Sequence, residues 1–406
     1  MTQALIQLVA VGPQNVPING KPEASVFRKA YQRVTHFALE SVRQQFTGTV
    51  GFGNQVQCLI SRNGDLLRQM ELELTLPTLT AGAAAADFSW VPNLGEVLLR
   101  RVDLEVGGIT IDTHYSRWFN IWQEVTRSTG KDSGYFKMIG NVSDLTNTVT
   151  ATVGNETLSA PQKLYVPLKF WFCEHPELAF PLIACQRHDV KVYIQFESLE
   201  NCVRSAGALP TAASALQADL YVTYVFLDGA ERTNFATKAH EYLIEQVQFV
   251  GSESYNGQAN ITRRLDGFNH PVKEIAFVQQ LDTAVSTAAT RDLTDFTNGS
   301  DAPMVSSAKL VLNGNDRFSV RDGTYFEQVQ PYYYHSRTPK TGINVYSFAE
   351  YPEEHQPTGT CNFSRIDNAQ LVMQLSNTAA STSYVFMKSY NVGRFVSGLF
   401  GLAYAA

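Results

Sequence analysis

The sequence predicts an all-β protein of two consecutive eight-stranded jelly-roll β-sandwiches, a double jelly roll, with short helices and long apical loops. Three observations support this prediction. At 406 residues the chain exceeds the usual size of one hydrophobic core, so two domains of about 200 residues are expected. Hydrophobic residues make up 44% of the chain, which is ample for two packed cores. The third observation is that one order of strands and turns occurs twice.

The first part of the repeated order is a hairpin followed by an aromatic segment. In the first half its members are a strand at 97–106, a turn at Gly107-Gly108, a strand at 109–113 and an aromatic segment at 115–122. In the second half they are a strand at 308–312, a turn at 313–315, a strand at 317–320 and an aromatic segment at 325–334. A duplicated plan of this kind indicates the fold more strongly than any single strand.

The second part of the repeated order is a strand, a break at a proline, an alternating strand and a final aromatic-rich strand. In the first half these are 163–172, Glu174 to Pro176, 189–196 and 219–227. In the second half they are 343–348, Tyr351 to Glu353, 368–375 and 383–395. The distance from glycine turn to proline break is longer in the first half, which we interpret as a loop insertion.

Composition along the chain predicts the domain boundaries. Residues 1–24 contain repeated Gly and Pro and are expected to form an N-terminal arm, before helical spacing at Phe27, Tyr31 and Val34 and a strand-like alternation from Phe37. The first jelly roll is predicted at 25–228, a short helical connector at 229–240 and the second jelly roll at 241–406. Three loops rich in Ala, Ser, Thr and Asn are expected to form an exposed crown: 128–161, 205–218 and 283–303.

Charge and cysteine content restrict the partners and the compartment. Charged residues form 17% of the chain, below the usual 25% or so, which favours large uncharged surfaces that become subunit contacts. A net charge of −6 argues against direct nucleic-acid binding, which needs many Lys and Arg contacts. Five scattered cysteines predict free thiols in a reducing compartment. No signal peptide and no transmembrane segment are apparent, so synthesis in the cytosol is expected.

One weak candidate metal site is present: Cys173, His175, Cys185 and His188 supply the two thiols and two imidazoles of a tetrahedral zinc shell. Residues 185 and 188 are three apart and would face opposite sides of a strand. We therefore favour buried strand residues here, and we predict no metal and no cofactor.

Other motifs do not indicate an enzyme. No G-x-S-x-G elbow occurs, and the glycine-rich run 51–54 lacks the Lys-Ser/Thr of a phosphate loop, so a strand-end bulge is expected there. Glu353, Glu354 and His355 are interpreted as a solvated turn. Five Asn-x-Ser/Thr sequons are candidate glycosylation sites, although without a signal peptide they would not meet the usual machinery: Asn141, Asn155, Asn260, Asn298 and Asn362.

Particular strings along both halves resemble the major capsid proteins of the nucleocytoplasmic large DNA viruses, the chlorella-virus, iridovirus and ascovirus group. In the first half they are FRKAYQR (27–33), FALES (37–41), ISRNGDL (60–66), VGGITID (106–112) and LYVPLKFWFC (164–173). In the second half they are HEYLIEQ (240–246), FNHPVK (268–273), LNGNDRF (312–318) and PEEHQPTGTCNFSRID (352–367). The resemblance therefore spans nearly the whole chain.

The resemblance implies a structural, non-enzymatic role. It implies homotrimers that act as pseudo-hexagonal capsomers in the icosahedral shell of a large double-stranded DNA virus. The implied partners are neighbouring capsomers, minor capsid proteins under the capsomer base and a nearby inner viral membrane, with assembly in the host cytoplasm. The N-terminal arm would lie under the capsomer. Three copies of a two-sandwich subunit would place six similar sandwiches around a three-fold axis.

Three alternatives remain. A transient double jelly-roll assembly scaffold is not separable by sequence from a permanent shell protein. A glycan-binding jelly-roll lectin would need exposed aromatics, whereas Trp118, Trp122 and Trp171 are predicted in the core and only Trp90 in a loop. A two-domain cupin would need an H-x-H metal motif, and the sequence has none.

Overall fold

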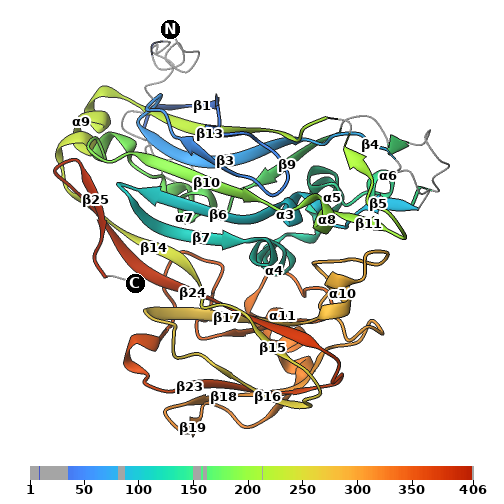
Figure 1. Ribbon diagram of the computed structural model, residues 1–406. Coiled ribbons are helices and arrows are strands. Elements are labelled where there is room, and N and C mark those ends of the chain that lie inside the picture. Colours follow the sequence, from blue (N-terminus) through green and yellow to red (C-terminus); the bar gives the residue numbers. More distant parts are fainter. Residues whose placement is uncertain are drawn as a thin grey trace, which may run out of the picture.

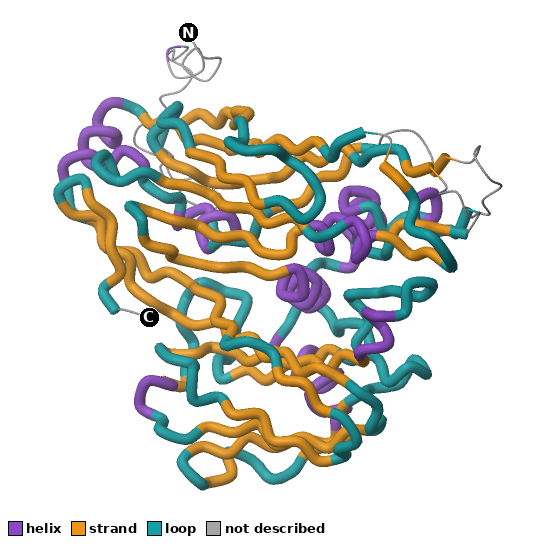
Figure 2. Tube along the Cα trace, in the orientation of Figure 1, coloured by secondary structure: helices purple, strands orange, loops and turns teal. Residues whose placement is uncertain are grey.

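The computed structural model describes residues 9, 35–80, 87–149, 157–158, 162–212 and 214–404. The predicted N-terminal arm, apart from Val9, and the helical spacing at 27–34 lie outside the described residues. The described part is mostly β-strand with short helices, arranged as two stacked β-sandwiches (Figures 1 and 2).

The first sandwich consists of two four-stranded antiparallel sheets. One sheet has the order β1 (Phe37–Gln44), β13 (Gln217–Leu227), β3 (Leu66–Thr75), β9 (Lys163–Pro167). The other has the order β2 (Gln55–Leu59), β10 (Val190–Phe196), β6 (Leu99–Val106), β7 (Ile109–Tyr115). Their inner faces enclose one apolar core, because alternate residues such as Leu72, Leu104 and Val192 point inward and are inaccessible to solvent.

The second sandwich repeats this layout. Its first sheet has the order β14 (His240–Phe249), β24 (Ser381–Val396), β17 (Pro271–Leu281), β21 (Ile343–Ser347). Its second sheet has the order β16 (Asn260–Arg264), β23 (Ala369–Leu375), β18 (Val305–Leu312), β19 (Asn315–Asp316). When each set of eight strands is numbered along the chain, both sandwiches have the orders 1-8-3-6 and 2-7-4-5. The predicted duplication and the double jelly roll are thereby confirmed.

The two glycine turns occupy equivalent positions, between the fourth and fifth strands of each sandwich. Gly107 and Gly108 have φ angles of +61° and +84°, and Asn313 and Gly314 have φ angles of +48° and +79°. Two consecutive left-handed residues joining paired strands form the hairpin turn that matches strand twist, and Gly and Asn tolerate this conformation. The Gly and Asn residues that mark these turns in the sequence are therefore required by the left-handed backbone.

The two aromatic segments are helices, and each lies between the fifth and sixth strands. The first is α4 (Ser116–Thr126), and the second is the π-helical η5 (Tyr325–Val329) continued by α11 (Gln330–Tyr334). The predicted strand at 317–320 is wrong, because its apolar residues do not alternate across a sheet. Phe318 packs against the rings of Phe326 and Tyr346, and Val320 is 60% exposed.

Other local predictions need correction. The strand expected at 163–172 ends at Pro167, and the chain continues into helix α7 (Trp171–Glu174). Residues 51–54 form a turn before β2, with Gly53 at φ +75°, and the structure has no bulge there. Trp90 does not lie in an open loop: it ends strand β5 (Phe88–Trp90), which pairs with β11 (Val203–Ser205), and it is 1% exposed. The one tryptophan available to the lectin hypothesis is therefore buried.

The connector between the sandwiches is helix α9 (Gly229–Thr237), whose first amide donates to the side chain of Asp228. The described parts of the three polar-rich segments lie near one end of the strands, on the right of Figure 1. Two of them contain short helices as well as loop: η2 (Thr129–Lys131), α5 (Asp132–Ile139) and α6 (Ser143–Thr146) in the first, and α10 (Asp282–Ser286) in the last. The remaining described elements are β4 (Leu79–Thr80), β8 (Thr157–Leu158), β12 (Thr211–Ala212), α3 (Leu94–Leu98), α8 (Leu199–Cys202), η3 (Pro176–Leu178), η4 (Leu182–Ala184), β15 (Glu253–Tyr255), β20 (Arg321–Asp322), β22 (Cys361–Asn362), η6 (Phe363–Arg365) and β25 (Leu399–Leu402).

Candidate functional site at the junction of the sandwiches

Helix α4 of the first sandwich packs on the outer face of the second sandwich. Its apolar residues recur at helical spacing and form one stripe: Trp118, Ile121, Trp122 and Val125. This stripe contacts side chains of β17, β21 and β24: Ala276, Val278, Ile343, Val345 and Phe386. Full burial of each large side chain contributes about 2 kcal/mol. The helix therefore fixes one sandwich against the other.

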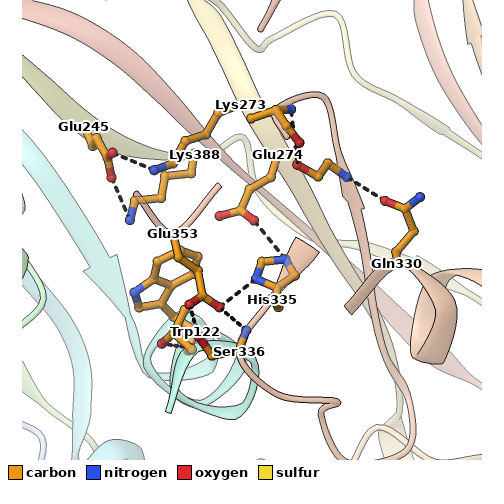
Figure 3. Close-up of polar contacts among 12 residues, drawn as sticks. Trp122, Glu245, Lys273, Glu274, Gln330, His335, Ser336, Glu353 and Lys388 are labelled. Atoms are coloured by element: carbon orange, nitrogen blue, oxygen red, sulfur yellow. Dashed lines mark hydrogen bonds and ion pairs between the residues drawn. The ribbon is translucent and has the colours of Figure 1, made fainter. Parts of the chain in front are cut away.

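A cluster of buried charges adjoins this apolar contact (Figure 3). The Nζ atom of Lys388 on β24 lies 2.8 Å from a carboxylate oxygen of Glu174 and 2.8 Å from one of Glu245. Lys273 on β17 approaches the other oxygen of Glu245 at 2.6 Å. The Lys388 ammonium also lies 3.7 Å from the ring centre of Trp122. Since Glu174 and Trp122 belong to the first sandwich, Lys388 joins the two halves of the chain.

Glu174 and Lys388 keep their charges although they are buried. Burial alone would raise the pKa of Glu174, but Lys388 and Lys169 outweigh it and lower that pKa to about 2. Burial would lower the pKa of Lys388, and the facing carboxylates of Glu174 and Glu245 raise it instead. A buried ion pair of this kind contributes little net stability, but removal of one partner leaves an uncompensated charge.

A second ionic contact surrounds His335, which follows helix α11. One ring nitrogen lies 3.3 Å from Glu274 on β17 and the other lies 3.2 Å from Glu353. Burial opposes the charged form of His335, but the two carboxylates outweigh it and raise its pKa to about 9. The prediction of a solvated turn at 353–355 is wrong for Glu353 and His355. Glu353 also accepts from the Ser336 amide at 2.7 Å, and His355 lies beside Glu245.

The predicted cysteine and histidine residues do not converge on one point. Cys173 lies in α7 and His175 directly follows that helix, whereas Cys185 and His188 lie in turns before β10. Cys185 donates to the carbonyl oxygen of His188 at 3.8 Å, and a ring nitrogen of His188 accepts from the Phe400 amide at 3.2 Å. The interpretation as strand residues is also wrong, because these segments are helix and turn. Within the described residues, one group of three potential ligands is found, and it joins His175 to Glu245 and His355.

Sequence reasoning missed most of the junction residues. Lys273, Glu274 and Lys388 lie in strands β17 and β24, and the sequence analysis assigned no role to them. A charge directly after an apolar run, as at Lys388 after Val385, Phe386 and Met387, is the signal that could have indicated a buried pair.

Further polar contacts tie the sandwiches together away from the charged cluster. The Val247 amide donates to Asp112 on β7 at 3.0 Å. The Arg117 guanidinium donates twice to the Gln280 side chain, at 2.9 and 2.8 Å. Strands β7 and β14 lie side by side at this point (Figure 1). The junction thus combines apolar, ionic and hydrogen-bonded contacts over its length.

The sequons differ in accessibility. Asn260 in β16 and Asn362 are exposed, and Asn141 and Asn298 are half-buried. The side-chain oxygen of Asn298 accepts from the amide of Ser300, and that of Asn362 accepts from the amide of Ser364. Asn155 lies outside the described residues. Glycosylation at these positions stays a prediction.

Helix α11 and the residue before it present an exposed apolar stripe. Val329, Tyr332 and Tyr333 are spaced three and four residues apart, which places them on one side of the helix. Tyr332 is 77% exposed and Tyr333 is 71% exposed. Its equivalent in the first sandwich, α4, has its apolar stripe covered. Within the described residues, no helix combines the length and apolar character needed to cross a membrane.

Comparison with known proteins gives consistent matches over the chain. The family description "Major capsid protein N-terminus" matches residues 25–228, and "Large eukaryotic DNA virus major capsid protein" matches residues 231–401. The chain is 40% identical over 428 residues to the major capsid protein of Pyramimonas orientalis virus and 39% identical over 454 residues to that of Paramecium bursaria Chlorella virus 1. Both comparisons cover 100% of each chain.

Solved structures match as well. The structure described as "PBCV-1 virus capsid, quasi-atomic model" has a TM-score of 0.78 and 36% identity, covering 94% of this chain and 100% of the other. The Faustovirus major capsid protein has a TM-score of 0.77 at 13% identity, covering 91% of this chain and 92% of the other, and supports the fold alone.

Proposed function

Because this chain belongs to the family of major capsid proteins of large eukaryotic DNA viruses, we propose that three copies associate into a pseudo-hexagonal capsomer. The chain itself is a capsid component of a virion. The capsomer follows from geometry: two sandwiches of one topology lie side by side in each subunit, and three subunits would supply six around a closed three-fold axis. The duplicated strand order is the observation that supports this proposal best.

The duplication also indicates which surfaces would meet between subunits. Within one subunit, the helix after the fifth strand of the first sandwich covers the outer face of the third and sixth strands of the second. The helix after the fifth strand of the second sandwich is α11, and its stripe of Val329, Tyr332 and Tyr333 is uncovered. In a ring of six sandwiches, α11 would pack on the first sandwich of the next subunit. This contact would be equivalent to that of α4 with the second sandwich of its own subunit.

The receiving face would be the outer side of β3 and β9, the third and sixth strands of the first sandwich. Gln69 and Glu71 on β3 are exposed there, and Pro167 on β9 is half-buried. This face contrasts with the outer face of β17 and β21, which α4 covers. Its polar groups suit the two tyrosines, since a tyrosine ring packs on the aliphatic parts of Gln and Glu while its hydroxyl hydrogen-bonds. The occupant we propose is a second copy of this chain.

Light scattering of the purified full-length protein tests the trimer. We expect a particle of three times 45.1 kDa at micromolar concentration. Replacing two exposed apolar anchors costs about 3 kcal/mol or more of association energy at each interface, so the double variant Tyr332→Ser/Tyr333→Ser should weaken each of the three interfaces on the order of 100-fold. The control is Tyr351→Ser, a 51% exposed tyrosine outside α11. A wild type that is monomeric at micromolar concentration contradicts the trimer, and a double variant as tightly associated as the control contradicts the assigned contact.

The remaining features of the role are part of the same proposal. Residues 25–228 and 241–406 would be the two sandwiches, joined by 229–240, with the polar-rich loops exposed as a crown. The arm at 1–24 would lie beneath the capsomer toward minor capsid proteins and an inner membrane. Assembly would take place in the host cytoplasm, without catalytic activity and without direct nucleic-acid contact. The net charge of −6 supports the last point.

A further inference from the structure

Two imidazoles and one carboxylate converge where the two sandwiches meet. The facing ring nitrogens of His175 and His355 each lie 4.0 Å from the same carboxylate oxygen of Glu245. The three ligand atoms all lie within 4.8 Å of one another, and the two imidazole rings are 5.2 Å apart between centres. His175 comes from the first sandwich, whereas Glu245 on β14 and His355 come from the second.

The facing nitrogen atoms lack the hydrogen bonds that a structural histidine normally makes. Nε2 of His175 and Nδ1 of His355 are both inaccessible to solvent and have no hydrogen-bond partner. Buried polar atoms without partners are uncommon and call for an explanation in each case. Here two of them face one anionic oxygen, an arrangement that a cation bound between the three groups would satisfy.

The duplicated breaks in the sequence explain how these residues meet. His175 precedes Pro176 in the break after the sixth strand of the first sandwich. His355 lies three residues after Pro352 in the break after the sixth strand of the second. The docking of one sandwich on the other brings both breaks to β14. The site therefore exists only when the junction is formed.

We propose that His175, Glu245 and His355 bind one divalent transition metal ion of the Zn²⁺ class, which links the two sandwiches of a subunit. Two imidazole nitrogens and one carboxylate oxygen are a donor set that suits Zn²⁺ and its neighbours. Ligands at about 2.1 Å in tetrahedral geometry lie about 3.4 Å apart. The two 4.0 Å separations from Glu245 therefore need a contraction of about 0.6 Å, and the separation between the two ring nitrogens, which lies within 4.8 Å, needs at most about 1.4 Å. Water would complete the coordination.

Lys273 and Lys388 limit the affinity of this site for a metal ion. Lys273 lies 2.6 Å from the oxygen that would bind the ion, and Lys388 lies 2.8 Å from the other oxygen. Their charges repel a cation, and Glu174 on the other side of Lys388 compensates part of this repulsion. We therefore expect weaker binding than in a three-histidine zinc site, and an affinity that increases when Lys273 is replaced by Met.

Histidine hydrogen–deuterium exchange tests the site in the full-length wild-type protein. Exchange at the imidazole Cε1 position is followed by mass spectrometry with and without added Zn²⁺. Metal coordination should slow this exchange at His175 and His355 by about tenfold or more, since a coordinated ring nitrogen no longer takes up the proton that exchange requires. His240, on β14 but outside the group, is the internal control. Equal rates with and without Zn²⁺ at His175 and His355 overturn the proposal.

Metal content gives a second measurement. After equilibration with Zn²⁺ and removal of free metal, the wild type and His240→Ala should retain about one ion per chain, and His175→Ala and His355→Ala should bind at least about tenfold more weakly. Retention by His175→Ala and His355→Ala equal to that of His240→Ala would assign the metal elsewhere and overturn the site. All three ligands come from one chain, so these results do not depend on whether the protein is a trimer.

Discussion

The ionic contact at His335 predicts how the stability of the protein depends on pH. His335 is buried between Glu274 and Glu353, and its pKa in the folded protein is about 9, compared with about 6.5 in an unfolded chain. Because the folded pKa is the higher one, the protonated imidazole stabilises the fold. This contribution is fully present below pH 6.5 and is lost as pH rises through 9.

The size of the contribution follows from the two pKa values. Each pKa unit corresponds to 1.36 kcal/mol, so a difference of about 2.5 units gives about 3 kcal/mol at pH 6. By the same linkage, about 1.4 kcal/mol remains at pH 8 and almost none at pH 10. Other groups titrate in this range as well, so the quantity to measure is the difference between the wild type and a variant that lacks the imidazole.

The assay is urea unfolding of the wild type and His335→Gln from pH 6 to pH 10, at one protein concentration because association contributes to stability. We expect the wild type to be more stable by about 3 kcal/mol at pH 6 and the two free energies to converge near pH 10. A difference that stays constant within about 0.5 kcal/mol refutes the reasoning. If His335→Gln does not fold, Cε1 exchange in the wild type gives the pKa of His335 directly, and a midpoint near 6.5 refutes it equally.

Three further predictions concern single side chains. Lys388→Met leaves the carboxylates of Glu174 and Glu245 without their shared cation and should lower the free energy of unfolding by about 3–5 kcal/mol. The matched control Lys309→Met removes a partly exposed pair and should cost at most about 1 kcal/mol in the same urea titration, so equal losses would contradict the buried network. Gly108→Ala places an alanine in a left-handed conformation without a new contact and should lower the free energy of unfolding by about 1 kcal/mol. The new methyl group of Gly107→Ala would also meet the His188 ring at 2.5 Å, so this variant should lower the unfolding midpoint further. A larger loss for Gly108→Ala than for Gly107→Ala would contradict the turn geometry. The thiol of Cys202 is buried and burial raises its pKa, so it should resist iodoacetamide at pH 7.5 in the folded protein, as followed by mass spectrometry; labelling as fast as in urea would show that the site is open.

Much of the fold was predictable because it depends on local rules. Left-handed residues in two-residue turns require Gly or Asn, so the hairpins at 107–108 and 313–314 were visible in the sequence. Period-two alternation identified β10 and β23. The helical form of 115–122 was not assigned, although Trp118, Trp122 and Val125 recur at helical spacing. The prediction of a strand at 317–320 was wrong because apolar residues two positions apart also occur in irregular segments. In this segment the ring of Phe318 packs on a helix.

The sequence by itself determined the duplicated strand order, the turns between strands and the burial of Trp118, Trp122 and Trp171, because period, turn chemistry and hydrophobicity act between near neighbours. Tertiary structure alone decided which charges meet. Lys388 and Glu174 are 214 residues apart, and neither position carries a local sign that it faces the other. His175 likewise reaches Glu245 and His355 only after one sandwich docks on the other. Contacts of this kind depend on the relative placement of two complete sandwiches, which no short-range pattern encodes.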